Sequence, residues 1–337
     1  MYYTIAQLKE RWRGILFKIV IVLMMTLNLY LNANNDFVSM YRMQGISAVE
    51  KELENSLKDM NYWKSYLEDK NVDLGYYEYK KYVILAQKEQ SELSLYEKIG
   101  NDYKLVLRNS VIVGENQGDK YFEGDKKTPE GAYELIEKKT QVDQFYGPFA
   151  LVTSYPNSFD MSLDKKGSGI WIHGMPFDGD REKFTKGCIA LDNKELENLE
   201  KNIDYKRTVL LTSQNEFKKA SKDDIALILS SIYKWKDAWK YSNIEDYLSF
   251  YSKDFRKSDK SNYYQFADYK RQIFSKNEDK SIKFSNIDIS PYPNSLNKKM
   301  YKILMDEEYL SPAIKFYGKK ELFVEIANNE LKILAED

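Results

Sequence analysis

The segment IWIHGMPFDGDREKFTKGCIALDN (residues 170–193) contains the only histidine and the only cysteine of this 337-residue chain. His173 and Cys188 are fifteen positions apart, in a sequence that is otherwise rich in tyrosine, lysine and acidic residues. A neutral imidazole can accept the proton of a nearby thiol, and the resulting thiolate is a strong nucleophile. This segment therefore predicts where the reactive groups of the fold lie.

The first five residues of the segment, IWIHG, have the pattern of a β-strand. In an extended chain, Trp171 and His173 point to one face, whereas Ile170 and Ile172 point to the other. We expect the two isoleucines to face the core and His173 to face a groove. Gly174 then lets the chain turn away into a charged loop.

The far end of the segment, TKGCIAL, predicts a tight turn that presents the thiol. Glycine at 187 permits a backbone in which the amide of Cys188, with Gly187 or Gly174 as a neighbour, points toward a developing oxyanion. Thiolate, base and oxyanion donors together define acyl transfer. Two other interpretations stay open, namely an accidental pair of structural residues and a metal site. Zinc would need carboxylates to complete its ligand set, and we expect neither a metal nor another cofactor.

Short apolar runs and period-two alternation dominate residues 76–214, which predicts a mostly β domain with few helices. Strands fit 82–86, 93–95, 103–107, 111–113, 149–153, 168–173 and 208–211. Thr128–Gly131 reads as a turn by its composition. After the cysteine, Asp192 and Glu195 resemble a capping box, and Leu196, Leu199 and Ile203 give the following helix one apolar face.

The amino terminus looks like an export segment over residues 1–33. Four basic residues precede the apolar run Ile19–Leu27, which is shorter than the about 20 residues that span a bilayer. A signal peptide fits best. The sequence at Leu31–Ala33 is a poor match to a cleavage site, so an uncleaved signal anchor remains an alternative. A buried amphipathic helix is a second alternative. An exported chain with one cysteine forms no internal disulfide.

The region before the β domain is predicted to be helical, and the region after it is predicted to contain helices followed by strands. In residues 34–75, an apolar stripe runs through Val49, Leu53, Leu57, Met60 and Trp63 at helical spacing. Residues 218–337 begin with a helical stripe over 222–255, and strands fit 282–289, 299–305, 314–317 and 322–326. That order predicts an α+β domain. The net charge of −1 and the lack of a basic patch argue against nucleic acid.

Several ordered motifs resemble the YkuD-type L,D-transpeptidase domain, whose signature is HG followed by [ST]-x-G-C-[IV]-x-[LM]. Here it stands as His173-Gly174 and Thr185-Lys186-Gly187-Cys188-Ile189-Ala190-Leu191. The stretches GDKKTPEGAYEL (124–135), YGPFALVTSYPNSFD (146–160) and GSGIWIHG (167–174) are also similar to the family. The resemblance implies a β-sandwich with few helices, a Cys188 nucleophile and a His173 base acting on peptidoglycan stem peptides in the periplasm.

Two positions depart from the commonest pattern of the crosslinking members of the family. Those members have His before Gly-Cys and Arg two residues after the Cys, where this chain has Lys186 and Ala190. An arginine there could clamp an acidic substrate group. Arg181 or Lys186 could replace it, and each is also an ordinary solvated loop charge. Tyr146, Ser168, Trp171 and Thr185 are further candidates for lining the groove, each with an ordinary packing explanation.

In its order of helices and strands, the second domain is similar to the cone-shaped nuclear-transport-factor-like (SnoaL-like) fold. The order of the two domains resembles that of the cell-shape L,D-carboxypeptidases of curved and helical Gram-negative bacteria. The expected activity is therefore trimming of tetrapeptide stems to tripeptides. The alternatives are an L,D-transpeptidase, which forms 3-3 crosslinks or attaches proteins to the wall, and a non-catalytic wall-binding scaffold. The sequence leaves open signal cleavage, the ligand of the second domain and a homodimer.

Overall fold

This computed structural model describes residues 36–178 and 182–337, which form two units that divide after Asp59. The first unit contains α2 (Ile46–Lys58), and α3 (Met60–Tyr66) begins the second. The predicted apolar stripe is therefore not on one helix, because Asp59 takes an extended conformation with φ −88° and ψ 120°. In the second unit, Trp63 of α3 stacks on Tyr233 with ring centroids 5.8 Å apart.

The predicted export segment, residues 1–33, lies outside the described residues. Among the residues that are described, no helix combines the length and the apolar character needed to span a bilayer.

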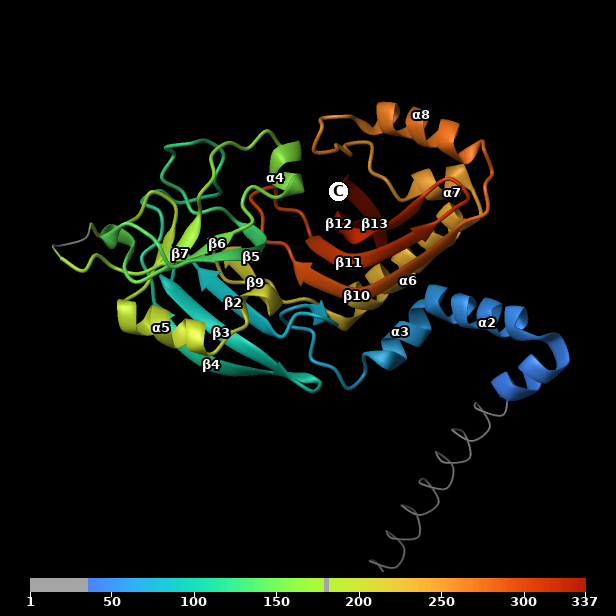
Figure 1. Ribbon diagram of the computed structural model, residues 1–337, viewed down its shortest axis with the longest axis horizontal. Coiled ribbons are helices and arrows are strands. Elements are labelled where there is room, and N and C mark those ends of the chain that lie inside the picture. Colours follow the sequence, from blue (N-terminus) through green and yellow to red (C-terminus); the bar gives the residue numbers. More distant parts are fainter. Residues whose placement is uncertain (1–35, 179–181) are drawn as a thin grey trace, which may run out of the picture. The chain divides into compact units, whose positions relative to one another are not determined.

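A β domain follows α3 and is built on one curled sheet (Figure 1). Within the described residues, this sheet has eight strands in the order β4-β3-β2-β9-β5-β6-β7-β8. Neighbours run antiparallel except in the pairs β2–β9 and β7–β8, which are parallel. The strands are β2 (Tyr82–Gln87), β3 (Glu92–Ile99), β4 (Asp102–Ser110), β5 (Gly131–Lys139), β6 (Ala150–Thr153), β7 (Trp171–His173), β8 (Ile189–Ala190) and β9 (Thr208–Ser213).

Sequence patterning located most of these strands but misjudged β5 and β7. The segment predicted as a turn, Thr128–Gly131, instead leads straight into the nine-residue β5. The strand expected over 168–173 is shorter, because Gly169 has φ +68° and the ladder begins only at Trp171. Residues 111–113 form only an isolated bridge, Ile112 with Ala190, outside the named strands.

Short helices fill the connections of the β domain. They are η1 (Gln144–Tyr146), α4 (Ser158–Ser162), α5 (Asn193–Lys201) and η2 (Tyr205–Arg207). Helix α5 starts as predicted, with the Asp192 side chain accepting from the amide of Lys194, although the reciprocal bond of a capping box is not among its contacts. Its buried face carries Leu196 and Leu199, and Ile203 packs on the same core after the helix ends.

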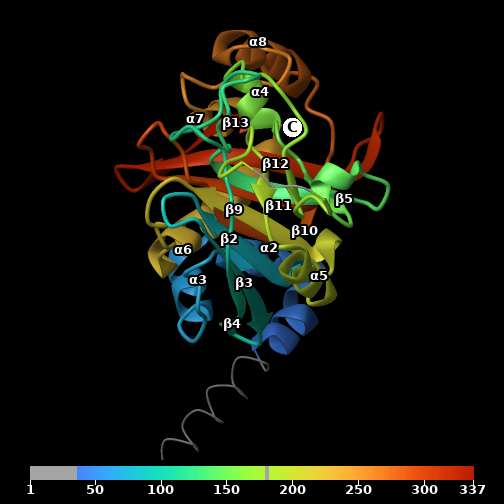
Figure 2. The ribbon, with the colours of Figure 1, turned by 90° about the vertical axis from the view of Figure 1, so that its left-hand side faces the viewer.

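The C-terminal domain, from α6 to β13, has the expected helices-then-strands order. Its helices are α6 (Lys222–Lys240), α7 (Ile244–Ser249) and α8 (Tyr263–Phe274). In the unit that begins at Met60, α8 and β4 lie at opposite ends (Figure 2). The sheet of the C-terminal domain has the order β1-β10-β11-β12-β13 among the described strands, and β1 joins it from the segment before the β domain. These are β1 (Tyr76–Tyr77), β10 (Ser281–Pro291), β11 (Met300–Leu310), β12 (Lys315–Ala327) and β13 (Glu330–Glu336).

Three features of this domain differ from the sequence prediction. The helix expected over 222–255 ends at Lys240, because Ser242 takes a positive φ of 56° and the chain restarts as α7. The two strands predicted at 314–317 and 322–326 are one continuous β12. Helix α8 and strand β13 were not predicted.

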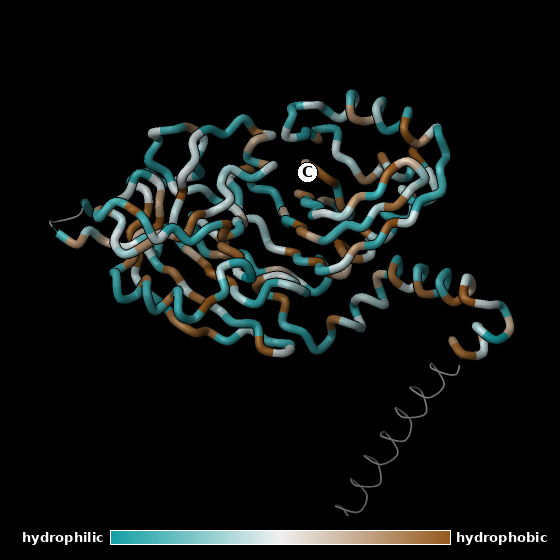
Figure 3. The backbone as a smooth tube through the Cα atoms, in the orientation of Figure 1, coloured by the Kyte–Doolittle hydropathy of each residue, from teal (hydrophilic) through white to brown (hydrophobic). Residues whose placement is uncertain are grey.

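One hydrophobic cluster is shared by the two domains, and a second lies within the β domain. The shared cluster includes Val83 and Leu211 from the β domain together with Met300, Phe323 and Leu334 from the C-terminal domain. Figure 3 shows hydrophobic stretches along the strands and hydrophilic residues along many of the connecting loops. The mostly β first domain and the α+β second domain of the prediction are thereby confirmed, and they pack as parts of one unit.

Candidate active site

The parallel pair β7–β8 brings the two ends of the opening segment together. In this ladder Ile172 lies opposite Ile189, and His173 lies opposite Ala190. Cys188 immediately precedes β8, two residues before Ala190. Because side chains alternate along a strand, this register puts Cys188 on the same face of the pair as His173.

The His173 imidazole is only 1% exposed and is oriented by the backbone beside it. Its Nδ1 lies 2.7 Å from the carbonyl oxygen of Gly174. A carbonyl can only accept, so in the neutral ring Nδ1 carries the proton and Nε2 carries the lone pair. This is the tautomer that a general base acting through Nε2 requires.

The surroundings of this strand partly correct the expectation of a groove at the histidine. Ile170 and Ile172 belong to the core, as predicted. His173, however, is covered by Tyr146, whose ring lies edge-on to the imidazole at 5.0 Å between centroids. Tyr146 also contacts Trp171 at 5.1 Å. The histidine is therefore buried against an aromatic ring rather than exposed on an open face.

The turn that carries Cys188 is fixed by one side-chain hydroxyl. Thr185 Oγ1 accepts from the amide of Gly187 at 3.0 Å and donates to the carbonyl of Cys188 at 2.7 Å. Gly187 has φ +133°, and a Cβ there would lie 2.7 Å from the carbonyl oxygen of Lys127. Both features require glycine at 187.

The cysteine sulfur is partly accessible. Cys188, the single cysteine of the chain, is of intermediate burial, and its Sγ lies 3.5 Å from the carbonyl oxygen of Gly169. The thiol is therefore neither sealed in hydrocarbon nor linked in a disulfide. It can be approached by a substrate while one neighbouring carbonyl orients it.

Two of the three residues expected to donate to an oxyanion use their amides inside the protein. The amide of Gly187 donates to Thr185 Oγ1, and the amide of Gly174 donates to the carbonyl of Tyr146 at 2.9 Å. Neither of these two amides is therefore available as an oxyanion donor in this arrangement.

The remaining predicted residues differ in how near they lie to these groups. Trp171 is half-buried beside Tyr146, and Thr185 is buried in the cysteine turn. Ser168 and Lys186 are exposed, with Ser168 one residue before Gly169. Arg181 lies outside the described residues. Within residues 36–178 and 182–337, no group of three or more His, Cys, Asp or Glu side chains could hold a metal ion.

Sequence reasoning missed two residues that shape the site. Gly169 supplies the carbonyl beside the sulfur, and Asn193 clamps the chain just after the histidine. Asn193 Oδ1 accepts from the amide of Met175 at 2.8 Å, and its Nδ2 donates to the carbonyl of the same residue at 3.1 Å. The signal for Asn193 was its place directly after the predicted N-cap Asp192. Nothing in the local pattern pointed to Gly169.

Comparison with known proteins identifies both domains. Residues 80–211 match the model of the L,D-transpeptidase catalytic domain (YkuD), and residues 227–337 match the Cds6 C-terminal NTF2-like domain. No curated protein matches the chain. The structure of Bd1075 from Bdellovibrio bacteriovorus is 29% identical with a TM-score of 0.62, covering 78% of this chain and 95% of that one.

A second structural relative is more similar. The helical cell shape determining protein Pgp2 from Campylobacter jejuni is 42% identical with a TM-score of 0.79, and the match covers 83% of this chain and all of the Pgp2 chain. A point mutant of Pgp2 gives the same identity, with a TM-score of 0.80. The chain therefore belongs to the family of Pgp2 and combines an L,D-transpeptidase (YkuD) catalytic domain with a C-terminal NTF2-like domain.

Proposed function

We propose that this protein is a periplasmic L,D-carboxypeptidase that removes the terminal D-Ala from peptidoglycan tetrapeptide stems and thereby influences cell shape. The observation that carries the proposal is the β7–β8 register, which sets Cys188 and His173 on one face with the sulfur partly accessible. Membership of the Pgp2 family, and the cell-shape role in the name of that relative, support the substrate class and the periplasmic location.

The reaction begins when Nε2 of His173 takes the proton from Cys188 Sγ. The thiolate attacks the carbonyl carbon between the L-centre of the third stem residue and D-Ala, and the Cys188 amide donates to the oxyanion. His173 then protonates the departing D-Ala nitrogen, which leaves a thioester on Cys188. Water, deprotonated by His173, attacks that thioester and releases the tripeptide and the free thiol.

Hydrolysis is favoured over crosslinking by the residue at position 190. Ala190 is fully buried and lies between His173 and Ile112, exchanging two backbone hydrogen bonds with Ile112. An arginine at this position would need space that the packing does not provide. The arginine clamp for an acidic substrate group that the crosslinking members carry here is therefore replaced by a small apolar residue, a form that resembles the hydrolytic branches of the family.

The test is to incubate the purified protein with disaccharide tetrapeptide and to analyse the products by mass. We expect loss of one D-Ala from each stem and no 3-3 dimers, with no product from the Cys188→Ala variant. Dimers made by the wild-type protein would instead establish the transpeptidase alternative. Unchanged substrate with wild-type protein, together with binding to isolated walls, would establish the scaffold alternative.

A further inference from the structure

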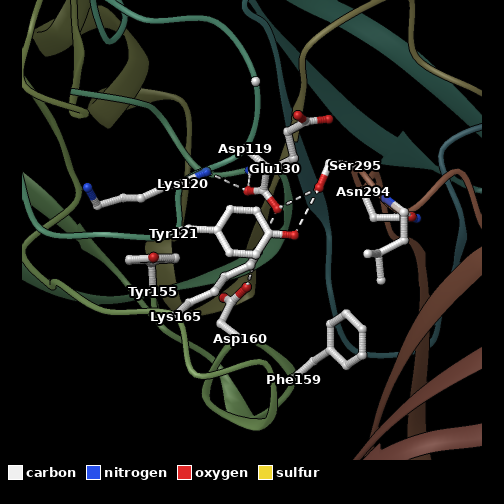
Figure 4. Close-up of polar contacts among 12 residues, drawn as sticks. Asp119, Lys120, Tyr121, Glu130, Tyr155, Phe159, Asp160, Lys165, Asn294 and Ser295 are labelled. Atoms are coloured by element: carbon white, nitrogen blue, oxygen red, sulfur yellow. Dashed lines mark hydrogen bonds and ion pairs between the residues drawn. The ribbon is translucent and has the colours of Figure 1, made fainter. Parts of the chain in front are cut away.

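A buried ion cluster lies in the β domain, on segments that lead to the cysteine turn. The Nζ of Lys165 is 2.6 Å from Oδ2 of Asp119 and 2.8 Å from Oδ1 of Asp160 (Figure 4). The three side chains are 2%, 3% and 0% exposed, respectively. A lysine this deeply buried keeps its charge only when carboxylates surround it. Removing either the lysine or its carboxylates therefore leaves an uncompensated buried charge.

This cluster joins two segments that are distant in the sequence. Lys165 belongs to the loop between α4 and β7, whereas Asp119 belongs to the segment that leads into β5. A second bond links the same segments, since the amide of Lys166 donates to the carbonyl of Tyr121 at 2.8 Å. The Tyr121 ring also lies over the Lys165 ammonium, 5.1 Å from it.

Both joined segments lead to residues that contact the cysteine turn. The loop that holds Lys165 continues to Gly169, whose carbonyl oxygen lies 3.5 Å from Cys188 Sγ. The segment that holds Asp119 continues to Lys127, whose carbonyl would meet any Cβ on Gly187 at 2.7 Å. Lys165 thus joins the piece of chain whose Gly169 carbonyl lies beside the sulfur to the piece whose Lys127 carbonyl lies against Gly187.

The C-terminal domain contacts the same cluster through the β10–β11 connection. Ser295 Oγ lies 3.5 Å from Oδ2 of Asp119 and 3.2 Å from the Tyr121 hydroxyl. The Tyr292 hydroxyl donates to Oδ1 of Asp160 at 3.4 Å. Each carboxylate is therefore shared between Lys165 and the second domain.

We propose that Lys165 is a positioning residue for Cys188, which fixes the Gly169 and Lys127 carbonyls around the cysteine turn and connects them to the C-terminal domain. The proposal deepens the function proposed above and rests on it for the catalytic readout. Burial lowers the pKa of Lys165, but the Asp160 and Asp119 carboxylates outweigh burial and raise that pKa above its ordinary value. The ammonium therefore stays charged.

The chain offers a matched control for this role in Lys302. Its side chain is also 2% exposed and also pairs with two carboxylates, Glu321 at 2.7 Å and Glu134 at 3.5 Å. That cluster likewise joins the two domains, but none of its members belongs to the segments that contact the cysteine turn. Lys165→Met and Lys302→Met remove equivalent buried charges, so both are expected to lower the melting temperature.

The experiment compares these two variants by three readouts on the full chain. Because Cys188 is the only cysteine, iodoacetamide labelling as a function of pH reports its thiol alone. For Lys165→Met we expect the labelling midpoint to move by more than about half a pH unit. We also expect kcat for D-Ala release to fall about tenfold, with KM within about twofold. Lys302→Met is expected to keep the wild-type labelling profile and kcat.

A milder pair keeps the test decisive if Lys165→Met does not fold. Asp119→Asn preserves volume and is expected to show the same changes at smaller amplitude, whereas Glu134→Gln is not. Wild-type labelling and kcat in folded Asp119→Asn or Lys165→Met would overturn the positioning role. If the wild-type protein releases no D-Ala while the labelling contrast holds, the proposed reaction fails and the positioning role stands.

Discussion

The ring of Tyr146 stands perpendicular to the imidazole of His173, with an interplanar angle of 89° and 5.0 Å between centroids. Aromatic contacts of this geometry contribute about 0.5–1.5 kcal/mol beyond the area that they bury. Since a factor of ten in rate corresponds to about 1.4 kcal/mol, loss of the contact is large enough to be measured. The ring is therefore expected to hold the base in its catalytic orientation.

Replacement of this ring should lower activity in proportion to the contact that is lost. We expect Tyr146→Ala to reduce kcat for D-Ala release about tenfold, because the His173 imidazole can then rotate and becomes exposed to water. Tyr146→Phe keeps the ring and should stay within about twofold of wild type. Equal loss in both variants would show that the hydroxyl, rather than ring packing, is what matters.

The hydroxyl of Thr185 makes a second prediction, since it both accepts from Gly187 and donates to Cys188 within one turn. Thr185→Val keeps the shape but leaves a buried amide and carbonyl without this hydroxyl, at a cost of about 1–3 kcal/mol. We expect kcat/KM to fall about tenfold or more. Thr185→Ser, which retains the hydroxyl, should remain near wild type, and a serine variant as impaired as valine would contradict the hydrogen-bonding role.

How much of the site could be predicted depends on how local each feature is. The strand alternation of IWIHG and the glycine before Cys188 are local, and the core position of Ile170 and Ile172 followed correctly from them. The cover over His173 was not predictable in this way, because Tyr146 comes from a 3-10 helix in a different connection. Its contact exists only after β6 has paired with β7.

The same distinction explains the errors in the fold. Strand β5 was missed because Pro129 and Gly131 commonly form turns. Gly131 instead pairs with Thr212 of β9, and this pairing with a distant strand outweighs the local turn preference. The buried Lys165 cluster was missed for a related reason. Lysine and aspartate are ordinary surface residues in a sequence, and only the packed structure shows them paired at less than 4% exposure.

Gly187 supports a third prediction, which separates backbone strain from close approach. Gly187→Ala would place a Cβ 2.7 Å from the Lys127 carbonyl oxygen at a φ of +133°. Such conformations cost about 1–3 kcal/mol for a residue with a side chain. We expect the substitution to shift the cysteine turn and lower kcat/KM by more than tenfold.

The matched control for Gly187 is Gly100, in the turn between β3 and β4. It also has a positive φ, of 59°, but an added Cβ there would meet nothing within 4 Å. Gly100→Ala should lower stability by about 1–2 kcal/mol and leave kcat/KM unchanged. If Gly187→Ala behaves like Gly100→Ala, the close approach of Lys127 has no catalytic consequence.

The last prediction concerns stability and pH at the junction of the two domains. Oδ1 of Asp288, in β10, accepts hydrogen bonds from the amides of Glu78, Tyr79 and Lys80 at 2.9–3.2 Å. Burial raises the pKa of Asp288 from 3.8 to about 6, against the opposing effect of these amides. Between pH 3.8 and 6 the folded state therefore binds more protons than the unfolded state. The free energy of unfolding should fall as pH rises through that window, by roughly 3 kcal/mol from this group.

Asp288→Asn removes this titration while keeping an oxygen that can accept from the three amides. Urea unfolding between about pH 4 and pH 7 should give a flatter dependence for the variant than for wild type. Asp306→Asn on β11 is the control, because Asn286 and Lys319 counter its partial burial and lower the pKa of Asp306 from 3.8. Its stabilising effect is lost only below pH 3.8, so the slope above that pH should match wild type. A wild-type slope in Asp288→Asn would mean that this carboxyl titrates in its ordinary range, because the amides then balance the effect of burial.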